Sequence, residues 1–304
     1  MNWIKKGLLL APHADVEWMS MSTMVPFVDS LGSGAYRVYF SGRDSKGRSR
    51  TGYFEMDLSD SARVRYLHPQ PVLDLGSLGT FDDSGVVGYA MVDAGGVKHL
   101  YYGGWTLGVT VPYYFSIGLA TSDDGCVCRR YSEAPILSRN AVDPFLNGAP
   151  SILIENGRWR MWYASGIGWT SRDGQTAPRM HIKYAESQDG IHWERDGTVC
   201  VDSNGPGEYA IVRPCVLRRD GLYRMWYSCR GERYRIGYAE SRDGLSWDRK
   251  DDEAGLGVSA GGWDSDMVEY AHVFGHEGRL HMLYNGNGYG RTGIGLAVEE
   301  SPGA

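Results

Sequence analysis

The chain has 304 residues, of which 42% are hydrophobic and 22% charged, and its formal net charge is -6. This composition excludes a disordered chain, because it provides enough apolar side chains for a large core. The chain has no Lys/Arg block, which excludes the basic surface that nucleic acids and anionic membranes require. No apolar run approaches about 20 residues, so no membrane span is predicted. A neutral or polar small ligand fits these limits best.

The N-terminal segment and the cysteines indicate a cytoplasmic protein. The apolar stretch at residues 8–10 is too short for the core of a signal peptide. The five cysteines are an odd number and include no Cys-x-x-Cys pair. Such usage predicts reduced cysteines that serve packing.

One phrase rich in aromatic and β-branched residues recurs five times, at residues 36–42, 100–104, 159–166, 223–228 and 280–286. By subtraction, its aligned aromatic residues are 62, 61, 64 and 57 positions apart: Phe40, Tyr102, Tyr163, Tyr227 and Tyr284. Each phrase has the composition of a buried strand. Five such units fill the chain. The period predicts an all-β fold over residues 1–304, a single five-bladed β-propeller domain with four-stranded antiparallel blades.

A second phrase, Ser-x-Asp-Gly, follows the first in the three central units, with the pairs Asp124-Gly125, Asp189-Gly190 and Asp243-Gly244. Asp-Gly pairs form hairpin turns, because glycine adopts a positive φ without steric penalty. The sialidase Asp-box carries one more residue between Asp and Gly. We therefore interpret these pairs as structural turns.

The N-terminal residues resemble the end of an internal unit. Residues 3–10 match residues 193–200, the expected fourth strand of the third blade. The last unit stops after its third strand. We expect the N-terminal strand to complete the last blade and to close the ring, which removes an open sheet edge.

Acidic residues stand six or seven positions before a common mark in the innermost strand of four units: Asp82, Asp83, Asp143, Glu208 and Asp264. The last unit adds Asp266 and Glu269. A ring of carboxylates around one axis is unfavourable unless it titrates, binds a cation or hydrogen-bonds a polyol. The alternative is that each Asp caps a turn. For Glu208 a functional role is favoured, because nothing in its surroundings requires a turn.

Other candidate ligand-binding residues lie at the axis and on the rim loops. Arg213 begins an innermost strand, where a guanidinium group needs a carboxylate or a ligand as partner. His272 also begins near the axis, although a lone histidine is more often a hydrogen-bonded core residue. The rim candidates for contact with a sugar are Arg43, Trp105, Arg230 and Asn287, and packing is the alternative role for the tryptophan.

With five blades and acids before the inner strands, the chain resembles the five-bladed glycoside hydrolases, namely the arabinanase and xylosidase family 43 and the invertase and levansucrase families. Its blade phrases, such as Trp-Arg-Met-Trp-Tyr at 159–163, look closer still to glycosidase-like propellers of bacterial biosynthetic gene clusters. The resemblance covers nearly the whole chain. It implies a central calcium ion near an axial histidine in some members, with His272 as the matching position, and it implies no required cofactor.

The same resemblance implies roles for the acids. Glu208 matches the general acid and Asp143 the residue that tunes it. The first blade has no acid in register with the family's base, and Asp15, Glu17 or Asp83 are the substitutes. Arg213 and His272 would hold the sugar, together with Asp264 and Glu269.

The sequence therefore predicts a glycosidase-like enzyme that acts on a small glycoside or a glycosylated metabolite. Two alternatives stay open at this point. One is non-hydrolytic chemistry on the same scaffold, by a phosphorylase, a transglycosylase or another acid–base enzyme. The other is a sugar-binding propeller without catalysis.

Overall fold

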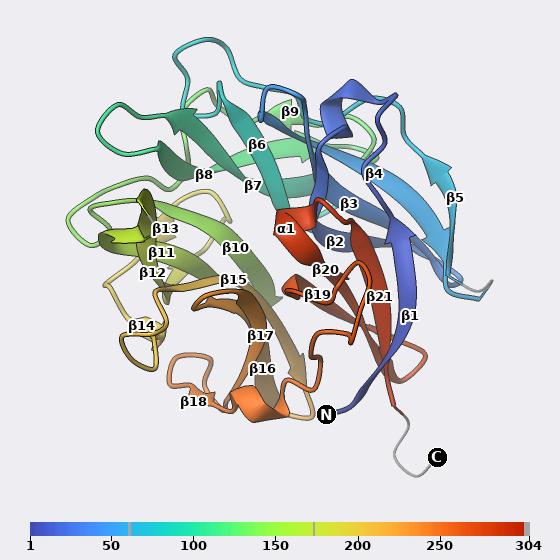
Figure 1. The fold of residues 1–304 in the computed structure, drawn as a ribbon. Helices are drawn as coiled ribbons and strands as arrows, with labels where there is room; N and C mark the ends of the chain where they lie inside the picture. The colour runs from blue at the N-terminus through green and yellow to red at the C-terminus, as the bar shows by residue number, and fades with distance from the viewer. Residues whose placement is uncertain (60–61, 173, 301–304) are drawn as a thin grey trace.

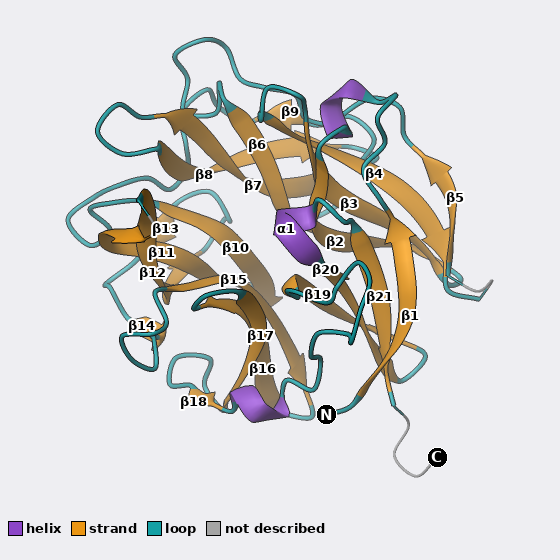
Figure 2. Cartoon of the chain, viewed as in Figure 1, coloured by secondary structure: helices purple, strands orange, loops and turns teal. Residues whose placement is uncertain are grey.

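The computed structural model describes residues 1–304 except 60–61, 173 and 301–304. Strands dominate the described chain, as expected for an all-β protein (Figure 2). The helical turns are short: η1 (Glu17–Met19), η2 (Asp251–Glu253) and α1 (Asn287–Gly290). Within the described residues, no helix has the length and apolar character that crossing a membrane requires.

An eight-stranded sheet forms from the first part of the chain. It consists of two antiparallel runs, which a parallel bridge between Ser49 and Gly85 joins. The runs are β2 (Ser22–Gly32), β3 (Ala35–Arg43), β4 (Ser49–Asp57) and β5 (Arg63–Leu67), followed by β6 (Gly85–Asp93), β7 (Lys98–Leu107), β8 (Tyr113–Ser122) and β9 (Arg129–Arg130).

The middle of the chain forms a nine-stranded sheet in the same way, with a parallel bridge between Met180 and Ala210. Its first run is β10 (Asn147–Glu155), β11 (Arg158–Arg172), β12 (Gln175–Ser187), β13 (Trp193–Glu194) and β14 (Val199–Val201). Its second run is β15 (Ala210–Arg219), β16 (Leu222–Arg230), β17 (Tyr234–Ser241) and β18 (Asp248–Arg249).

A four-stranded sheet unites the two ends of the chain. It contains β19 (Glu269–His276), β20 (Arg279–Asn285) and β21 (Ile294–Glu299), and the N-terminal strand β1 (Trp3–Leu10) pairs antiparallel with β21. Side chains strengthen this pairing, because Lys5 Nζ lies 2.6 Å from Asp264 Oδ2 and Trp3 Nε1 donates to the Ala254 carbonyl at 2.9 Å.

The Asp-Gly pairs form turns, as predicted. Their glycines have φ values of 77°, 75° and 77° at Gly125, Gly190 and Gly244. In each turn the preceding serine hydroxyl accepts a hydrogen bond from the glycine N–H. Each glycine carbonyl in turn accepts a hydrogen bond from a buried aromatic side chain of the preceding run, at 2.9 Å from Tyr39, 2.7 Å from Tyr101 and 2.7 Å from Trp162. These turns therefore tie adjacent runs together.

The apolar cores lie mainly between adjacent runs. The five aligned aromatic residues of the repeated phrase are all fully buried there: Phe40, Tyr102, Tyr163, Tyr227 and Tyr284. The innermost strands β2, β6, β10, β15 and β19 surround the middle of the molecule, with α1 among them (Figure 1). One further apolar cluster, which includes Met24, Val87 and Met180, faces this middle region.

Candidate functional site

The innermost strands contain bulges that face the middle of the molecule. In β2, β10, β15 and β19 the pairing with the next strand shifts register at this point. One residue of each bulge has a left-handed backbone, with φ of 56° at Val25, 51° at Ala149, 56° at Arg213 and 56° at Tyr270. Left-handed geometry is unfavourable for a residue with a Cβ, but a bulge re-aims side chains. All four of these residues line one cavity.

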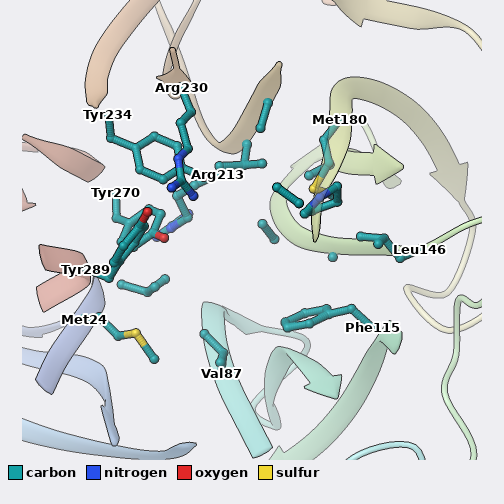
Figure 3. A pocket seen from close by; sticks show the side chains of 18 of the residues that line it. Met24, Val87, Phe115, Leu146, Met180, Arg213, Arg230, Tyr234, Tyr270 and Tyr289 are labelled. Carbon is teal, nitrogen blue, oxygen red and sulfur yellow. The ribbon is translucent and has the colours of Figure 1, made fainter. Parts of the chain in front are cut away.

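The cavity has a volume of about 1140 Å³ and draws lining residues from all the innermost strands. This volume exceeds the range of about 300–1,000 Å³ that is common for small-molecule sites. Figure 3 shows that arginine and tyrosine side chains gather on one side, whereas apolar side chains occupy the other. The two sides therefore offer different chemistry to a ligand.

Arg230, at the end of β16, lies among three tyrosine rings on the polar side. Its Cζ is 5.3 Å from the ring centroid of Tyr209, 5.3 Å from that of Tyr234 and 5.1 Å from that of Tyr289. Cation–π contacts of this kind hold a guanidinium group without neutralising its charge. Arg230 therefore presents a positive charge to the cavity.

Arg213 lies on the same side and is 2% exposed. Its guanidinium donates to the carbonyls of Pro26 at 3.1 Å and Pro214 at 3.3 Å, and it lies over the Tyr89 ring. Its Nε has no hydrogen-bond partner within the described chain. Burial lowers the pKa of Arg213, yet an arginine stays protonated in proteins. The result is a buried cation that a ligand anion would stabilise.

Glu269 begins β19 behind the polar side and is fully buried. Neither carboxyl oxygen accepts a hydrogen bond of normal geometry within the described structure. Burial raises the pKa of Glu269 well above its ordinary value, and the charge of Arg230 opposes this only in part. Burial therefore favours the protonated form of Glu269, which lies close to Arg230 and to the tyrosines of the wall.

The charged groups at the cavity are mostly cationic. Among the described lining residues, the four basic ones are Arg43, Arg213, Arg230 and Arg233, and Glu232 is the acidic one. Arg233 is paired with Asp266 at 2.9 Å on the exposed rim. The interior therefore favours a ligand with negative charge, in contrast to the net charge of -6 of the whole chain.

Four of the eight predicted ligand-binding residues are part of the cavity wall. Arg213, Arg230, Arg43 and Trp105 line the cavity, and the Trp105 indole donates to Ser49 Oγ at 2.8 Å. Glu269 lies behind the wall. The structure thus brings together the basic and aromatic residues that the sequence analysis placed on the rim loops and the inner strands.

The predicted general acid Glu208 lies outside the cavity lining. It forms a two-pronged ion pair with Arg249, with N–O distances of 2.8 and 3.0 Å, and accepts a hydrogen bond from the Asn204 backbone N–H at 2.8 Å. Arg249 also contacts Asp251, which accepts a hydrogen bond from the Tyr227 hydroxyl.

Asp143 is fully buried in a similar network outside the cavity lining. It accepts hydrogen bonds from Ser165 at 2.6 Å, Tyr163 at 2.8 Å and Lys183 at 3.0 Å, and from Arg195 at 2.7 Å. Burial acts to raise the pKa of Asp143, but the bonds from Ser165 and Lys183 outweigh it and lower that pKa below its usual value. The carboxylate is therefore held ionised.

The contact of a buried Asp with a tyrosine hydroxyl and a basic side chain recurs in two other runs. Asp82 accepts hydrogen bonds from the Tyr102 hydroxyl at 3.0 Å and from Arg130 at 2.8 Å. Asp264 accepts them from the Tyr284 hydroxyl at 3.0 Å and from Lys5 at 2.6 Å. In each case the tyrosine is the aligned aromatic residue and the base comes from the outermost strand of the run. This contact ties the inner segment to the outer edge of the sheet.

The three substitutes for the base also lie outside the cavity lining. Asp83 accepts hydrogen bonds from the Gly79 N–H at 3.0 Å and the Ser84 hydroxyl at 2.8 Å, as a turn cap does. Glu17 accepts one from Ser45 at 2.6 Å, and the side chain of Asp15 is 92% exposed. Asn287 uses its side chain to accept from the N–H groups of Asp266 and Met267.

The surroundings of His272 do not fit a calcium ion. Its Nε2 accepts a hydrogen bond from the Val28 N–H at 3.3 Å, and its Nδ1 lies 3.8 Å from Cys215 Sγ. Calcium binds six to eight oxygen ligands, whereas these two contacts of the imidazole are with a backbone N–H and a sulfur atom. The described residues contain no group of three or more His, Cys, Asp or Glu side chains that could hold a metal. Burial lowers the pKa of His272 to about 3, so the imidazole is neutral.

Sequence reasoning missed several aromatic residues of the cavity: Tyr113, Phe115, Tyr209 and Tyr234. Two of them carried a usable signal. Tyr209 directly precedes the innermost strand β15, and Tyr234 follows the loop that Arg230 begins. Phe115 and Tyr113 belong to the extended end of β8, and nothing in their spacing predicts which way their rings point.

Three solved structures share this fold across nearly the whole chain. A glycoside hydrolase aligns with a TM-score of 0.77 at 19% identity, over 98% of this chain and 92% of that one. A structure from a study of the GH130 family of mannoside phosphorylases aligns with a TM-score of 0.72 at 16% identity, over 100% and 95%. A thermostable family-43 glycoside hydrolase aligns with a TM-score of 0.67 at 16% identity, over 93% and 91%. At these identities the likeness establishes the fold.

Relatives in sequence are also known. The chain is 42% identical over 301 residues to the uncharacterized proteins MT1551 and Rv1502 of Mycobacterium tuberculosis strains CDC 1551 / Oshkosh and ATCC 25618 / H37Rv, covering 99% of this chain and 100% of each relative. It is 30% identical over 131 residues to a 1,2-beta-oligomannan phosphorylase of Thermoanaerobacter sp. strain X514, a match that spans 40% of this chain and 44% of that protein. No family model matches the chain.

The chain has the β-propeller fold of these solved structures, which places it in the class of β-propeller proteins. Within this class, the chain belongs to the family of the mycobacterial proteins MT1551 and Rv1502.

Proposed function

We propose that this protein is a carbohydrate-active enzyme of the glycoside phosphorylase type, which binds phosphate at Arg213 and Arg230 and cleaves a glycosidic bond in the central cavity. The observation that carries the proposal is the buried Arg213, whose guanidinium has carbonyl partners but no carboxylate partner in the described structure. A phosphate dianion would supply the missing negative charge.

Phosphorolysis suits a cavity that is rich in cations and poor in carboxylates. Hydrolysis uses two carboxyl groups, about 5–5.5 Å apart or about 6.5–9.5 Å apart. Among the described lining residues only Glu232 is acidic. In phosphorolysis the phosphate itself is the nucleophile, so no base is needed to activate water.

The proposed reaction balances with a single acid. A phosphate oxygen bonds to the anomeric carbon, the bond from that carbon to the leaving oxygen breaks, and the leaving oxygen takes a proton, which yields a sugar 1-phosphate and an alcohol. Glu269 is the acid of the site, because burial raises its pKa and favours the protonated form. Since Glu269 lies behind the wall, Tyr234 or Tyr289, which line the cavity, would pass the proton on.

The comparisons support a glycoside as substrate. One relative in sequence is named a 1,2-beta-oligomannan phosphorylase, and one structural neighbour comes from a family of mannoside phosphorylases. We extend the proposal to a soluble oligosaccharide or a glycosylated metabolite as substrate and to the cytoplasm as location. The five free cysteines fit a reducing compartment.

The proposal includes the architecture. We infer five blades in one domain over residues 1–304, each blade being one antiparallel run, with β1 closing the ring. The pairing of β1 with β21 supports this closure.

Hydrolysis is the second candidate, because two of the structural neighbours are glycoside hydrolases. It would use Glu208 as acid, Asp143 as the tuning group, and Asp83, Asp15 or Glu17 as base. It requires these acids to leave their present ion pairs and turn contacts and to enter the cavity.

Measurement of phosphate release from sugar 1-phosphates in the presence of sugar acceptors tests the proposal. We expect release that depends on both the donor and the acceptor and that falls at least 100-fold in Arg213→Gln and in Arg230→Gln. Arg242→Gln is the matched control, since Arg242 is exposed on an Asp-Gly turn. Formation of free reducing sugar from glycosides without phosphate would instead establish hydrolysis. Sugar binding without turnover would establish a non-catalytic binder.

A further inference from the structure

The cavity has an apolar side that phosphate and sugar hydroxyls alone do not match. Val87, Phe115, Leu146 and Met180 lie on this side, across from Arg230 and the labelled tyrosines, whereas Met24 lies beside Tyr289 (Figure 3). These four apolar residues come from separate strands or from the segment before one; three of them belong to a single buried apolar cluster, and Phe115 packs against it. This cluster differs from the other cores, because it surrounds an open cavity instead of filling a space between sheets.

The apolar character extends to the innermost positions. At the bulges, where the strands turn side chains toward the cavity, Arg213 and Tyr270 are polar, but Val25 and Ala149 are not. Sugar hydroxyls placed against such a surface would lose their hydrogen bonds to water without gaining partners. An apolar ligand group there would remove both apolar surfaces from water.

The size of the cavity leaves room for such a group. Its volume of about 1140 Å³ is above the range that is common for small-molecule sites, about 300–1,000 Å³. Phosphate and one sugar residue at the arginines would fill only part of it. The side chain of Met180, which can adapt its shape to a ligand, stands on the apolar side.

We propose that the glycoside bound in this cavity has an alkyl or aryl aglycone, whose apolar part lies against Val87, Phe115 and Met180 while the phosphate lies at Arg213 and Arg230. This inference rests on the proposed function. It agrees with the geometry of displacement at the anomeric carbon, because the incoming phosphate and the departing aglycone occupy opposite faces of the sugar. The basic and apolar sides of the cavity also face each other (Figure 3).

Calorimetric titration with three phosphate esters tests the inference: methyl phosphate, phenyl phosphate and n-octyl phosphate below its micelle concentration. They share the anion and differ in the apolar group. We expect n-octyl or phenyl phosphate to bind at least 10-fold more tightly than methyl phosphate. Equal affinity of all three esters would overturn the inference.

Two variants separate the sides of the cavity. Met180→Gln should lower the affinity for the apolar ester about 10-fold and leave that for methyl phosphate unchanged, which also shows that the variant is folded. Arg213→Gln should weaken all esters alike. Met21→Gln, at a methionine that is 49% exposed, is the matched control. An unchanged preference for the apolar ester in Met180→Gln would contradict the inference.

The outcomes distinguish this inference from the proposed function. Turnover of sugar 1-phosphates with equal affinity for all three esters leaves the function standing and removes the apolar subsite. Tight binding of the apolar esters without turnover of any donor leaves the subsite standing and removes phosphorolysis.

Discussion

At the scale of single residues, the cavity concentrates two unfavourable features. Arg213 carries a charge with no carboxylate beside it among the described residues, and its backbone has a φ of 56°. Glu269 is buried, and the part of the chain that the structure describes offers it no hydrogen-bond partner of normal geometry. Strained or unpaired groups of this kind persist where the surrounding structure enforces them, and they cluster at functional sites. Their position around one cavity is the physical reason to expect chemistry there.

The buried Glu269 makes a prediction about pH and stability. Because burial raises its pKa above the ordinary value of 4.5, the folded state keeps a proton that the unfolded state releases above that pH. Stability should therefore fall as the pH rises above about 4.5, by at most about 1.4 kcal/mol per pH unit from this group. Glu269→Gln, which mimics the protonated acid, should flatten this fall and be more stable than the wild type at pH 8.

Urea denaturation between pH 5 and pH 8 measures the effect. The control is Glu232→Gln, since Glu232 is exposed on the rim and should leave the pH dependence unchanged. A Glu269→Gln variant with the pH dependence of the wild type would show that the carboxyl group is ionised in the folded protein.

At the scale of elements, two repeated contacts hold the strands of a run and its neighbours in place. Within a run, an acid before the innermost strand binds the aligned tyrosine and a base at the outer edge of the run, as Asp143 binds Tyr163 and Arg195, which directly follows β13. Between runs, the carbonyl of an Asp-Gly turn accepts a hydrogen bond from an aromatic side chain, as Gly190 does from Tyr101. Both contacts join backbone segments far apart in the sequence.

The turn contact predicts that substitution by alanine costs different amounts of unfolding free energy at two glycines of similar backbone geometry. A Cβ at Gly190 would lie 2.6 Å from Tyr101 Oη, whereas a Cβ at Gly157 would have nothing within 4 Å, and their φ values are 75° and 76°. Gly157→Ala should cost about 1 kcal/mol of unfolding free energy from its left-handed backbone alone. Gly190→Ala should cost about 3 kcal/mol, because the clash adds to that strain. Equal losses in urea denaturation would show that the turn does not pack against Tyr101 as described.

At the scale of the whole molecule, the two ends of the chain share a sheet. β1 adds to β21, and Lys5 of β1 reaches the nearly buried Asp264, whose side chain is 3% exposed. Burial acts to raise the pKa of Asp264, but the bond from Lys5 outweighs it and the pKa is lowered. The N-terminal strand therefore contributes a charge that the last sheet requires.

Removal of that charge should destabilise the whole fold. Lys5→Ala leaves Asp264 with fewer partners, and we expect a loss of about 2 kcal/mol, below the value for a fully buried pair because Lys5 is partly exposed. Lys6→Ala is the matched control, because Lys6 is the exposed neighbour on the same strand. Thermal unfolding at pH 7 compares them. Equal melting temperatures would mean that the ion pair contributes nothing to the folded state.

The sequence by itself determined the all-β character, the repeat and the turns. Aromatic residues about 60 positions apart mark buried strands, and Asp-Gly pairs mark turns, because both signals depend on local preference and on periodic burial. The charge of Arg213 and its place on an innermost strand were also accessible, since few buried positions tolerate an arginine without a partner.

Only the tertiary structure decided the character of the cavity. Glu208 and Asp143 share the register of an axial acid, but register does not say toward which neighbour a carboxylate turns, and each lies in an ion pair with a base from another strand. The left-handed bulges that turn Val25 and Arg213 inward are set by the pairing of strands. A cavity is built from residues distant in the chain, and its charge and apolar surface arise only when the strands are assembled.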